Sequence, residues 1–259
     1  MDGSRLVRWL GFPATLILGD TLVLDRWLWL RERLPMARSG ERLLDVGCGS
    51  GAFTIGAALR GYEAVGLSWD DANNRKATER AAQCGPAGAR FEVVDVRRLD
   101  DHATALGQFD VIVNCENIEH IIDDDKLMRD IANRLKPGGF LLLTTPWFFY
   151  KPITKGDEGP FVLEETGAHV RRGYTRTMLA ELCERAGLQI EEVSSCSGFV
   201  SQKLTWLLRV LERFSLPLGW LAVLPLRPLP PLLDPVLRGL FGVSDYSICL
   251  VAYKPRFST

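Results

Sequence analysis

The chain has 259 residues, of which 47% are hydrophobic and 24% charged, so it can bury an ample core and is too apolar to be disordered. Its formal net charge of −1 argues against nucleic acid as the main partner, because nucleic-acid binding usually needs a basic field. The six cysteines form no CxxC pair and no Cys/His spacing suited to zinc, so we expect reduced thiols and no metal site. No apolar run reaches the roughly 18–20 residues of a spanning helix. We therefore expect a soluble, cytoplasmic protein.

The first predicted element is a helix at residues 24–34, in which Leu24, Trp27, Leu28 and Leu30 face inward. With the residues before it, this helix forms a helical cap over residues 1–40.

Strands and helices then alternate in regular order. Buried strands are predicted at 42–47, 62–68, 89–96, 109–115 and 140–146, with helices at 51–61, 70–85 and 123–139 between them. A further helix from residue 175 stops at Gly187 and precedes a sixth strand, and the last strand is 246–254. Repeated βα units indicate a Rossmann-like α/β fold: a seven-stranded, mostly parallel sheet with helices on both faces and an antiparallel last strand. Residues 41–196 and 245–259 make up this domain.

An apolar insertion occupies residues 197–244, between the last two strands. Six of the 14 prolines of the chain fall between Phe214 and Pro235. We expect short helices at 203–214 and 233–241, joined by a bent connector, because prolines spaced so closely disfavour a regular helix. The insertion could cover a substrate cleft, pair two subunits as a homodimer, or rest on a membrane surface.

The stretch LLDVGCGSGAFTI, residues 43–55, carries the most informative motif. Gly47, Gly49 and Gly51 stand between the first strand and its helix, where glycines let the backbone approach a ligand closely. Their spacing, G-x-G-x-G, differs from the G-x-G-x-x-G of NAD-binding turns. With Asp45 at the strand end, the stretch resembles motif I of the class I S-adenosylmethionine-dependent methyltransferases.

Neighbouring segments match the same family in order over residues 40 to 195. The resemblance places Asp95 and Val96 against the adenine, Cys115 and Glu116 at the cofactor edge, and Glu119 with His120 beyond them. Within the family, the chain resembles the branch of small-molecule O-methyltransferases such as those of ubiquinone biosynthesis. It implies that S-adenosyl-L-methionine is bound by Asp45, Gly47, Cys48, Gly49, Gly51, Ser68, Trp69, Asp95, Val96, Cys115 and Glu116.

One position departs from the family pattern. The family commonly ends its second strand with an acid that holds the ribose hydroxyls, whereas this chain has Ser68 there. A hydroxyl can still bond a ribose, without charge assistance. Asp70 and Asp71 are interpreted as the N-cap and first turn of the next helix. Trp69 could stack near the adenine or only pack.

A general base would help if the acceptor is a hydroxyl, and histidine is the usual choice near neutral pH. His102 is predicted on an exposed helix surface, whereas His120 and His169 follow the fourth and fifth strands, on the face where α/β enzymes place ligands. Glu119, His120 and His169 are therefore the catalytic candidates. Either histidine could instead be structural. Arg171, Arg172 and Tyr174 could bind an anionic group of the substrate or form the solvated entrance to a helix that Thr175 caps.

The leading hypothesis is an S-adenosylmethionine-dependent methyltransferase that acts on a small molecule, with oxygen favoured over nitrogen or carbon as the acceptor atom. Two alternatives remain open: the same fold with N-methylation, lipid C-methylation or cyclopropanation chemistry, and a cofactor-binding module without catalysis. The aromatic and aliphatic cap, the stretch PWFFYKP (146–152) and the insertion predict an acceptor with an apolar portion. That acceptor could be lipid-linked, polyketide-like or quinone-like.

Overall fold

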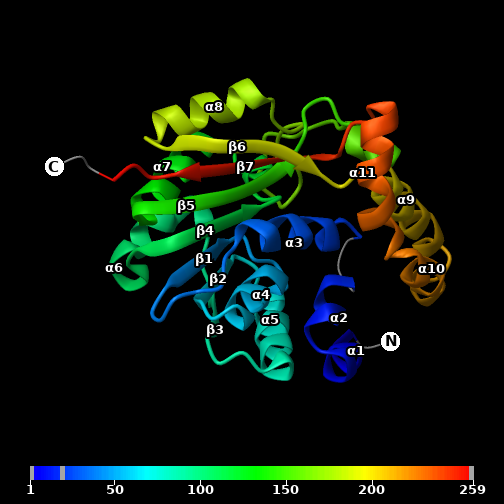
Figure 1. Cartoon of the computed structure of the whole chain (residues 1–259), viewed down its shortest axis with the longest axis horizontal. Coiled ribbons are helices and arrows are strands. Elements are labelled where there is room, and N and C mark those ends of the chain that lie inside the picture. The colour runs from blue at the N-terminus through cyan, green and yellow to red at the C-terminus, as the bar shows by residue number, and fades with distance from the viewer. Residues whose placement is uncertain (1–2, 18–20, 257–259) are drawn as a thin grey trace.

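A single seven-stranded sheet forms the centre of the protein (Figure 1). The structure is a computed structural model that describes residues 3–17 and 21–256. The strand order is β3-β2-β1-β4-β5-β7-β6. Strands β1 to β5 pair in parallel, and β7 runs antiparallel to both β5 and β6. The predicted fold class is therefore confirmed. The strands are β1 (Arg42–Val46), β2 (Glu63–Ser68), β3 (Ala89–Val93), β4 (Phe109–Cys115), β5 (Leu135–Pro146), β6 (Gln189–Cys196) and β7 (Ser247–Tyr253).

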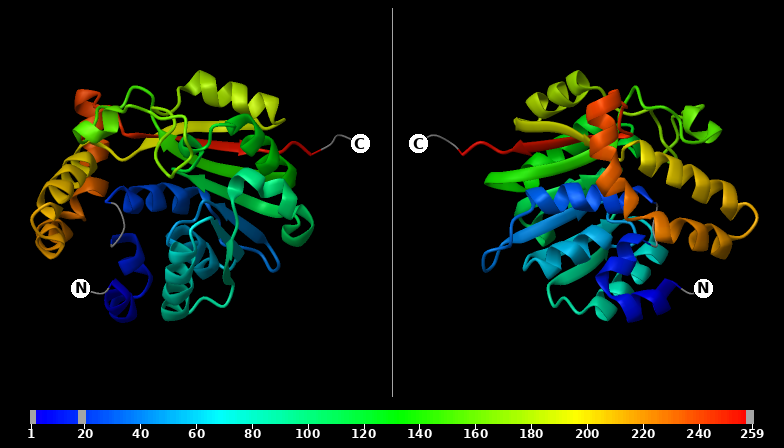
Figure 2. Two further views of the ribbon diagram at one scale, coloured as in Figure 1. Left: turned by 180° about the vertical axis from the view of Figure 1, so that it is seen from behind. Right: turned by 45° about the vertical axis from the view of Figure 1, so that its right-hand side comes forward.

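Helices cover both faces of the sheet (Figure 2). One face carries the helices α6, α7 and α8, with the 3-10 turns η1 and η2. The other face carries α3, α4 and α5. The elements of this core are α3 (Leu22–Arg33), α4 (Ala52–Leu59), α5 (Asp71–Cys84), η1 (Val96–His102), α6 (Ala103–Leu106), η2 (Ile118–His120), α7 (Asp124–Arg134), η3 (Lys155–Glu158) and α8 (Arg176–Arg185).

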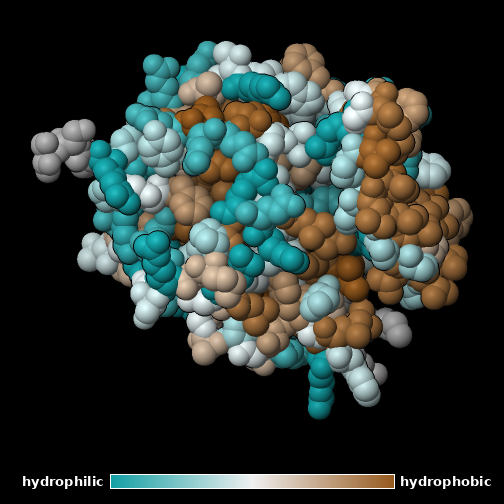
Figure 3. Space-filling view, in the orientation of Figure 1, coloured by the Kyte–Doolittle hydropathy of each residue, from teal (hydrophilic) through white to brown (hydrophobic). Residues whose placement is uncertain are grey.

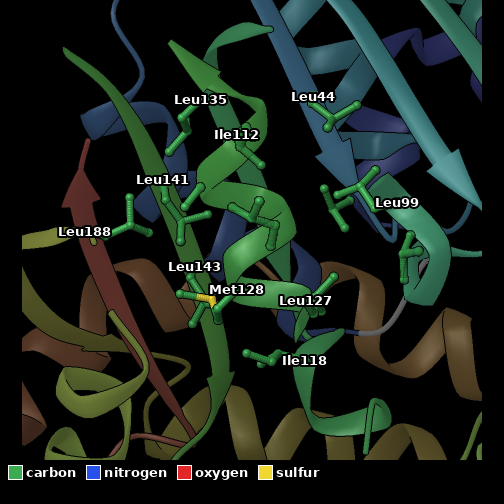
Figure 4. Close-up of a cluster of buried hydrophobic side chains, with 14 of the residues drawn as sticks. Leu44, Leu99, Ile112, Ile118, Leu127, Met128, Leu135, Leu141, Leu143 and Leu188 are labelled. Carbon is green, nitrogen blue, oxygen red and sulfur yellow. The ribbon is translucent and has the colours of Figure 1, made fainter. Parts of the chain in front are cut away.

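The central strands are apolar along their whole length because both of their faces are covered. In β5, Leu141, Leu142 and Leu143 are all fully buried although successive side chains point to opposite faces. Figure 4 shows Leu141 and Leu143 packed with Met128 of α7 in the largest of the core clusters. The helix starts follow from the capping residues: Asp70 accepts from Ala72 N and Thr175 from Met178 N. The interpretation of both residues as N-caps is confirmed.

The N-terminal segment folds as α1 (Gly3–Leu10), α2 (Phe12–Ile17) and α3. In α3 the buried side chains include Trp27, Trp29 and Leu30, whereas Leu24 and Leu28 are only half-buried. The predicted inward face is thus rotated by part of a turn, because Trp29 packs toward β6 and donates to Ser194 Oγ at 2.9 Å.

The insertion between β6 and β7 is more helical than predicted. It contains α9 (Phe199–Glu212), α10 (Leu216–Val223), η4 (Leu224–Leu226) and α11 (Leu229–Phe241). Most of its prolines stand in first turns, where the missing N–H has no intrahelical partner to lose, and only Pro235 lies inside a helix. The predicted helical pieces are present as α9 and α11, and the segment expected as a bent connector is itself largely helical, as α10 and η4. Among the described residues, no helix combines the length and the apolar character needed to cross a bilayer.

Candidate active site

The candidate site lies at the carboxyl ends of the parallel strands. The chain leaves β1 toward β2 on one side and β4 toward β5 on the other, so the strand order reverses between β1 and β4. Open α/β sheets bind ligands in the crevice at such a switch point. The turn after β1 and the segment after β4 border that crevice.

The glycine turn after β1 adopts a backbone that other residues avoid. Gly47, Gly49 and Gly51 have φ angles of +84°, +50° and +83°. The amides of Gly47 and Cys48 are occupied, since both donate to Leu67 O. Above Gly49 the space is open, because a Cβ placed there would meet no atom within 4 Å. The exposed backbone of this turn therefore fits a ligand that approaches it closely, as the sequence predicts for the cofactor.

Asp45, near the end of β1, stabilises the glycine turn by a buried hydrogen bond to the following helix. Its side chain is almost fully buried and accepts a hydrogen bond from the Thr54 hydroxyl at 2.7 Å. Burial raises the pKa of Asp45 to about 6, although the Thr54 hydroxyl opposes the shift. Asp45 therefore fixes the first turn of α4 against the strand. Cys48 is buried beside it.

Two of the residues predicted to bind the cofactor lie at the end of β2: Ser68 is buried and Trp69 is exposed. The Ser68 side chain is buried and accepts from the amide of Asp70 at 3.2 Å. Trp69 is 66% exposed, and a Cβ on Gly167 would lie 3.7 Å from its ring. The loop after β5 thus passes close to Trp69, whose side chain remains mostly exposed.

An ion-pair bridge follows β3. Arg97 binds Asp95 with a shortest distance of 2.5 Å and Glu165 at 2.8 Å. The hydrogen bonds from Arg97 lower the pKa of Asp95. Glu165 also accepts from the amide of Ile122 at 2.7 Å, so it joins the loop after β5 to both neighbouring segments. Val96 is buried behind this bridge.

Glu116, directly after β4, is fully engaged. Its carboxylate binds Arg26 of α3 at 3.1 Å and accepts from the hydroxyls of Thr144 at 3.1 Å and Ser247 at 3.0 Å. Its φ of +48° lies in the left-handed region, which is uncommon for a residue other than glycine. Cys115 before it is buried. Glu116 therefore joins the N-terminal cap to the central strands at the edge of the crevice.

The three catalytic candidates form one cluster. Glu119 Oε1 lies 4.0 Å from Nε2 of His120 and 4.0 Å from Nε2 of His169. The two imidazole rings meet edge to face, with their centroids 4.7 Å apart. The other carboxylate oxygen of Glu119 accepts from the Thr145 hydroxyl at 3.1 Å, and the Glu119 carbonyl accepts from the amide of Val170. The structure thus brings together all three predicted residues.

Two buried polar atoms of this cluster have no hydrogen-bond partner among the described residues: Glu119 Oε1 and His120 Nδ1. Burial raises the pKa of Glu119 well above its usual range, and the neighbouring Glu116 adds to the shift. Burial, and then the adjacent His120, lower the pKa of His169 to about 4. The cluster therefore offers a carboxyl that tends to keep its proton beside a neutral imidazole. One carboxylate and two imidazoles, with ligand atoms within 4.8 Å of one another, could also hold a metal ion, a site that the sequence did not predict.

The anion-binding interpretation of the residues after His169 is not supported. The Arg171 guanidinium binds Asp124 and the carbonyl of Ile121. Arg172 donates to the carbonyls of Phe148 and Tyr150, and the Tyr174 hydroxyl also donates to Asp124. These groups hold the loop after β5 in place. His102 is exposed at the end of η1, as predicted.

Several residues of the site were missed from the sequence. They support the predicted residues by tertiary contacts, and they are Arg26, Thr54, Arg97, Thr144, Thr145, Glu165 and Ser247. Each is a common residue type in an unremarkable local pattern. The sequence contains no local signal that could have identified them.

Comparison with known proteins agrees with this fold. Residues 24–193 match the family described as a methyltransferase domain, which covers well over half of the chain. The chain therefore belongs to the S-adenosylmethionine-dependent methyltransferases, and S-adenosyl-L-methionine is its cofactor. The glycine turn with its open backbone fits that cofactor.

Among curated relatives, the ubiquinone biosynthesis O-methyltransferase of Marinobacter nauticus is 31% identical over 171 residues, which are 64% of this chain and 70% of the relative. The enzyme of the same name from Pseudomonas aeruginosa is 30% identical over 173 residues, which are 64% of this chain and 71% of that enzyme. Solved structures show the same fold. An S-adenosylmethionine-dependent methyltransferase from Mesorhizobium loti has a TM-score of 0.56 at 22% identity, over 92% of this chain and 99% of the other. Phosphoethanolamine N-methyltransferase 2 of Haemonchus contortus has a TM-score of 0.61 at 20% identity, over 93% of this chain and 55% of the other.

Proposed function

We propose that this methyltransferase transfers the methyl group to a hydroxyl of a small molecule with an apolar portion, such as a lipid-linked or quinone-like compound. The observation that carries the proposal is the convergence of two imidazoles on Glu119 Oε1, a buried oxygen without a partner among the described residues. A hydroxyl of the acceptor placed among these three side chains would satisfy that oxygen. It would also meet a base.

The chemistry of the cluster suits deprotonation of a hydroxyl. S-adenosyl-L-methionine, when bound, supplies an electrophilic methyl group on a sulfonium. An imidazole of the cluster would take the proton of the acceptor hydroxyl while the carbon–sulfur bond of the sulfonium breaks and the carbon–oxygen bond forms. His169 is neutral at pH 7, since its pKa is lowered to about 4, and can therefore accept a proton. Glu119 orients the hydroxyl by a hydrogen bond.

The relatives support an oxygen acceptor, and the surroundings of the site support an apolar one. The curated relatives are named as O-methyltransferases of ubiquinone biosynthesis. The family match ends at residue 193, before the insertion. Close to the site, Trp147, Phe148 and Phe149 stack edge to face, and Phe149 is 64% exposed. The acceptor is therefore proposed to share the hydroxyl chemistry of the relatives, with its apolar portion against residues of this chain.

Transfer of an isotope-labelled methyl group to a panel of apolar phenols, quinols and amines tests the proposal. We expect label in the product only with hydroxyl acceptors, with an O-methyl signal by NMR. Label on nitrogen or carbon would show one of the alternative chemistries. Cofactor binding without transfer to any acceptor would favour a non-catalytic module.

Three variants test the roles of the cluster. We expect His120→Ala, His169→Ala and Glu119→Gln to keep cofactor affinity. The variant that lacks the base is expected to lose about 10²–10⁴-fold in kcat. His102→Ala is the matched control, since His102 is exposed and outside the cluster. Full activity in all three variants would exclude base catalysis by these residues.

Chelation separates a base from a metal site. We expect activity to survive EDTA, because the neutral imidazole of His169 provides proton transfer without a metal. Loss of activity with EDTA, restored by a divalent ion in wild type and not in Glu119→Gln, would instead assign the three side chains to a metal.

A further inference from the structure

The insertion carries a disproportionate share of the exposed apolar surface. Of the 22 large hydrophobic side chains that are exposed among the described residues, eleven lie between residues 199 and 241. Figure 3 shows this apolar surface over the elements that Figure 1 labels α10 and α11. We call it the insertion face, and its members are Phe199, Trp206, Phe214, Leu218, Leu221, Leu229, Leu232, Leu233, Val236, Leu240 and Phe241.

Helix α11 exposes apolar side chains and buries its acid, whereas a surface helix usually exposes its polar side chains. Its residues 229, 232, 233, 236 and 240 are apolar, exposed, and spaced to form one stripe along the helix. The opposite side holds Asp234, which is buried and accepts from the amides of Val200 and Ser201 at the start of α9. The acid is thus used inside as a cap, and the apolar stripe points outward. An outward apolar stripe indicates a partner, because water alone does not favour it.

The other two helices add aromatic and basic side chains to the face. On α9, Phe199, Lys203 and Trp206 follow helical spacing and are exposed, and Lys203 Nζ lies 5.1 Å over the Phe199 ring. On α10, Leu221 is 74% exposed. An exposed face with basic residues and aromatics beside aliphatic side chains is typical of helices that lie in a membrane interface.

The charges of the insertion favour an anionic partner. Its exposed charged residues are three basic ones, Lys203, Arg213 and Arg238, and one acid, Glu212. Lys203 and Arg213 make no ion pair with any residue that the structure describes. A symmetric dimer through this face would place like charges against each other, since an isologous contact joins a surface to its own copy. An anionic lipid surface would meet opposite charge.

We propose that the insertion face binds the surface of an anionic lipid bilayer. It would lie on the bilayer and not cross it, since α11 has 13 residues and would span only about 20 Å. Binding does not depend on methyl transfer and is tested without it.

The insertion is anchored to segments that border the site, so binding would orient the crevice. Arg209 of α9 binds Asp157 of the loop after β5 at 3.0 Å. The hydroxyls of Thr205 on α9 and Thr21 at the start of α3 are hydrogen-bonded. Helix α3 therefore contacts both the insertion, through Thr21, and the edge of the crevice, through the ion pair of Arg26 with Glu116. A bilayer under the insertion face therefore fixes the position of the cap and of the loop after β5 relative to the lipid.

Flotation with vesicles tests the proposal on the full chain. We expect the protein to float with vesicles of phosphatidylcholine and phosphatidylglycerol, and less with phosphatidylcholine alone. Leu232→Ser/Leu240→Ser should abolish flotation, whereas Met36→Ser/Leu59→Ser, which removes two exposed apolar side chains elsewhere, should not. Lys203→Glu/Arg213→Glu should weaken binding to the anionic vesicles at least about tenfold and reduce its dependence on salt.

Thermal melting and light scattering complete the design. All variants are expected to melt near the wild-type temperature, since the replaced side chains are exposed. A wild-type protein that stays in solution with anionic vesicles overturns the proposal. So does a wild-type dimer that Leu232→Ser/Leu240→Ser converts to a monomer, because the face would then be occupied by a second copy.

Discussion

The turn after β1 and the cluster after β4 lie at the same edge of the sheet, yet they are built in different ways. In the turn, Asp45, Gly51 and Thr54 are close neighbours in the chain, and the required backbone shape follows from glycine φ angles. In the cluster, Glu119 lies beside His169, which belongs to a different loop, and accepts a hydrogen bond from Thr145 of β5. One region is specified locally and the other by the tertiary fold. The two should therefore respond to mutation in different ways.

The largest expected effect is in the turn. A Cβ on Gly47 would lie 2.5 Å from the Asn117 side chain and would also need a φ of +84°. Strain and overpacking together cost about 2–6 kcal/mol. We therefore expect Gly47→Ala to reduce affinity for S-adenosyl-L-methionine, measured by calorimetry, at least about 30-fold, since 1.4 kcal/mol is a factor of ten.

Gly85→Ala is the matched control for this prediction. Gly85 has a φ of +82°, and a Cβ there would meet no atom within 4 Å. It therefore tests the backbone strain alone, away from the crevice. Equal cofactor affinity in the two variants would show that the contact with Asn117 does not shape the turn.

The next largest effect is expected for the ion pair between Arg26 and Glu116, the residue directly after β4. Arg26→Met removes the cation that compensates the largely buried Glu116 carboxylate, and losing one partner of a buried pair costs about 3–5 kcal/mol. We expect the free energy of unfolding in urea to fall by about that amount. Arg31→Met, on the exposed side of the same helix, is expected to change it little.

A second substitution checks the cause. Arg26→Met/Glu116→Gln removes the uncompensated charge and should recover most of the lost stability. Failure to recover it would assign the effect to other contacts of Arg26 and leave the link between α3 and β4 without energetic support.

These two regions also explain what the sequence could and could not predict. The glycine turn, the mostly parallel sheet with its antiparallel last strand and the N-caps Asp70 and Thr175 follow from local patterns, and the structure confirms them. The pairing of Arg26 with Glu116, or of Arg97 with Glu165, joins segments far apart in the chain. No periodicity or spacing encodes such a contact. For the same reason, the sequence left open whether Arg171 binds an anionic group of the substrate, whereas in the structure it binds Asp124.

The helical content of the insertion was underestimated from the sequence for a different reason. Closely spaced prolines predicted a bent connector, but a proline in the first turn of a helix loses no hydrogen bond. The start of α11 at Leu229 uses this freedom for Pro230 and Pro231. Whether a proline stands at the start or in the middle of a helix depends on where that helix begins, and the apolar composition on all sides of this segment gave no boundary signal.

The smallest expected effect is on the pH dependence of stability. It distinguishes the two regions clearly, because the pKa of Asp45 is raised and that of His169 is lowered. The pKa of Asp45 is raised to about 6, so its favourable contribution to folding is complete below about pH 3.8 and is lost as the pH rises through 6. The pKa of His169 is lowered to about 4, so its contribution is complete above about pH 6.5 and is lost as the pH falls through 4. Between pH 4 and 6 the two contributions oppose each other.

Isosteric substitutions should separate these contributions. Asp45→Asn keeps an acceptor for the Thr54 hydroxyl and removes the titration, so the free energy of unfolding should rise more steeply with pH between 4 and 6 than in wild type. His169→Gln should make the same slope shallower. Each change is at most one proton, about 1.4 kcal/mol per pH unit. Urea unfolding at about pH 4.5, 5.5 and 6.5, in one-unit steps around the shifted pKa values, measures both slopes. Slopes that change in the same direction would contradict the difference between a buried acid under the turn and a neutral imidazole in the cluster.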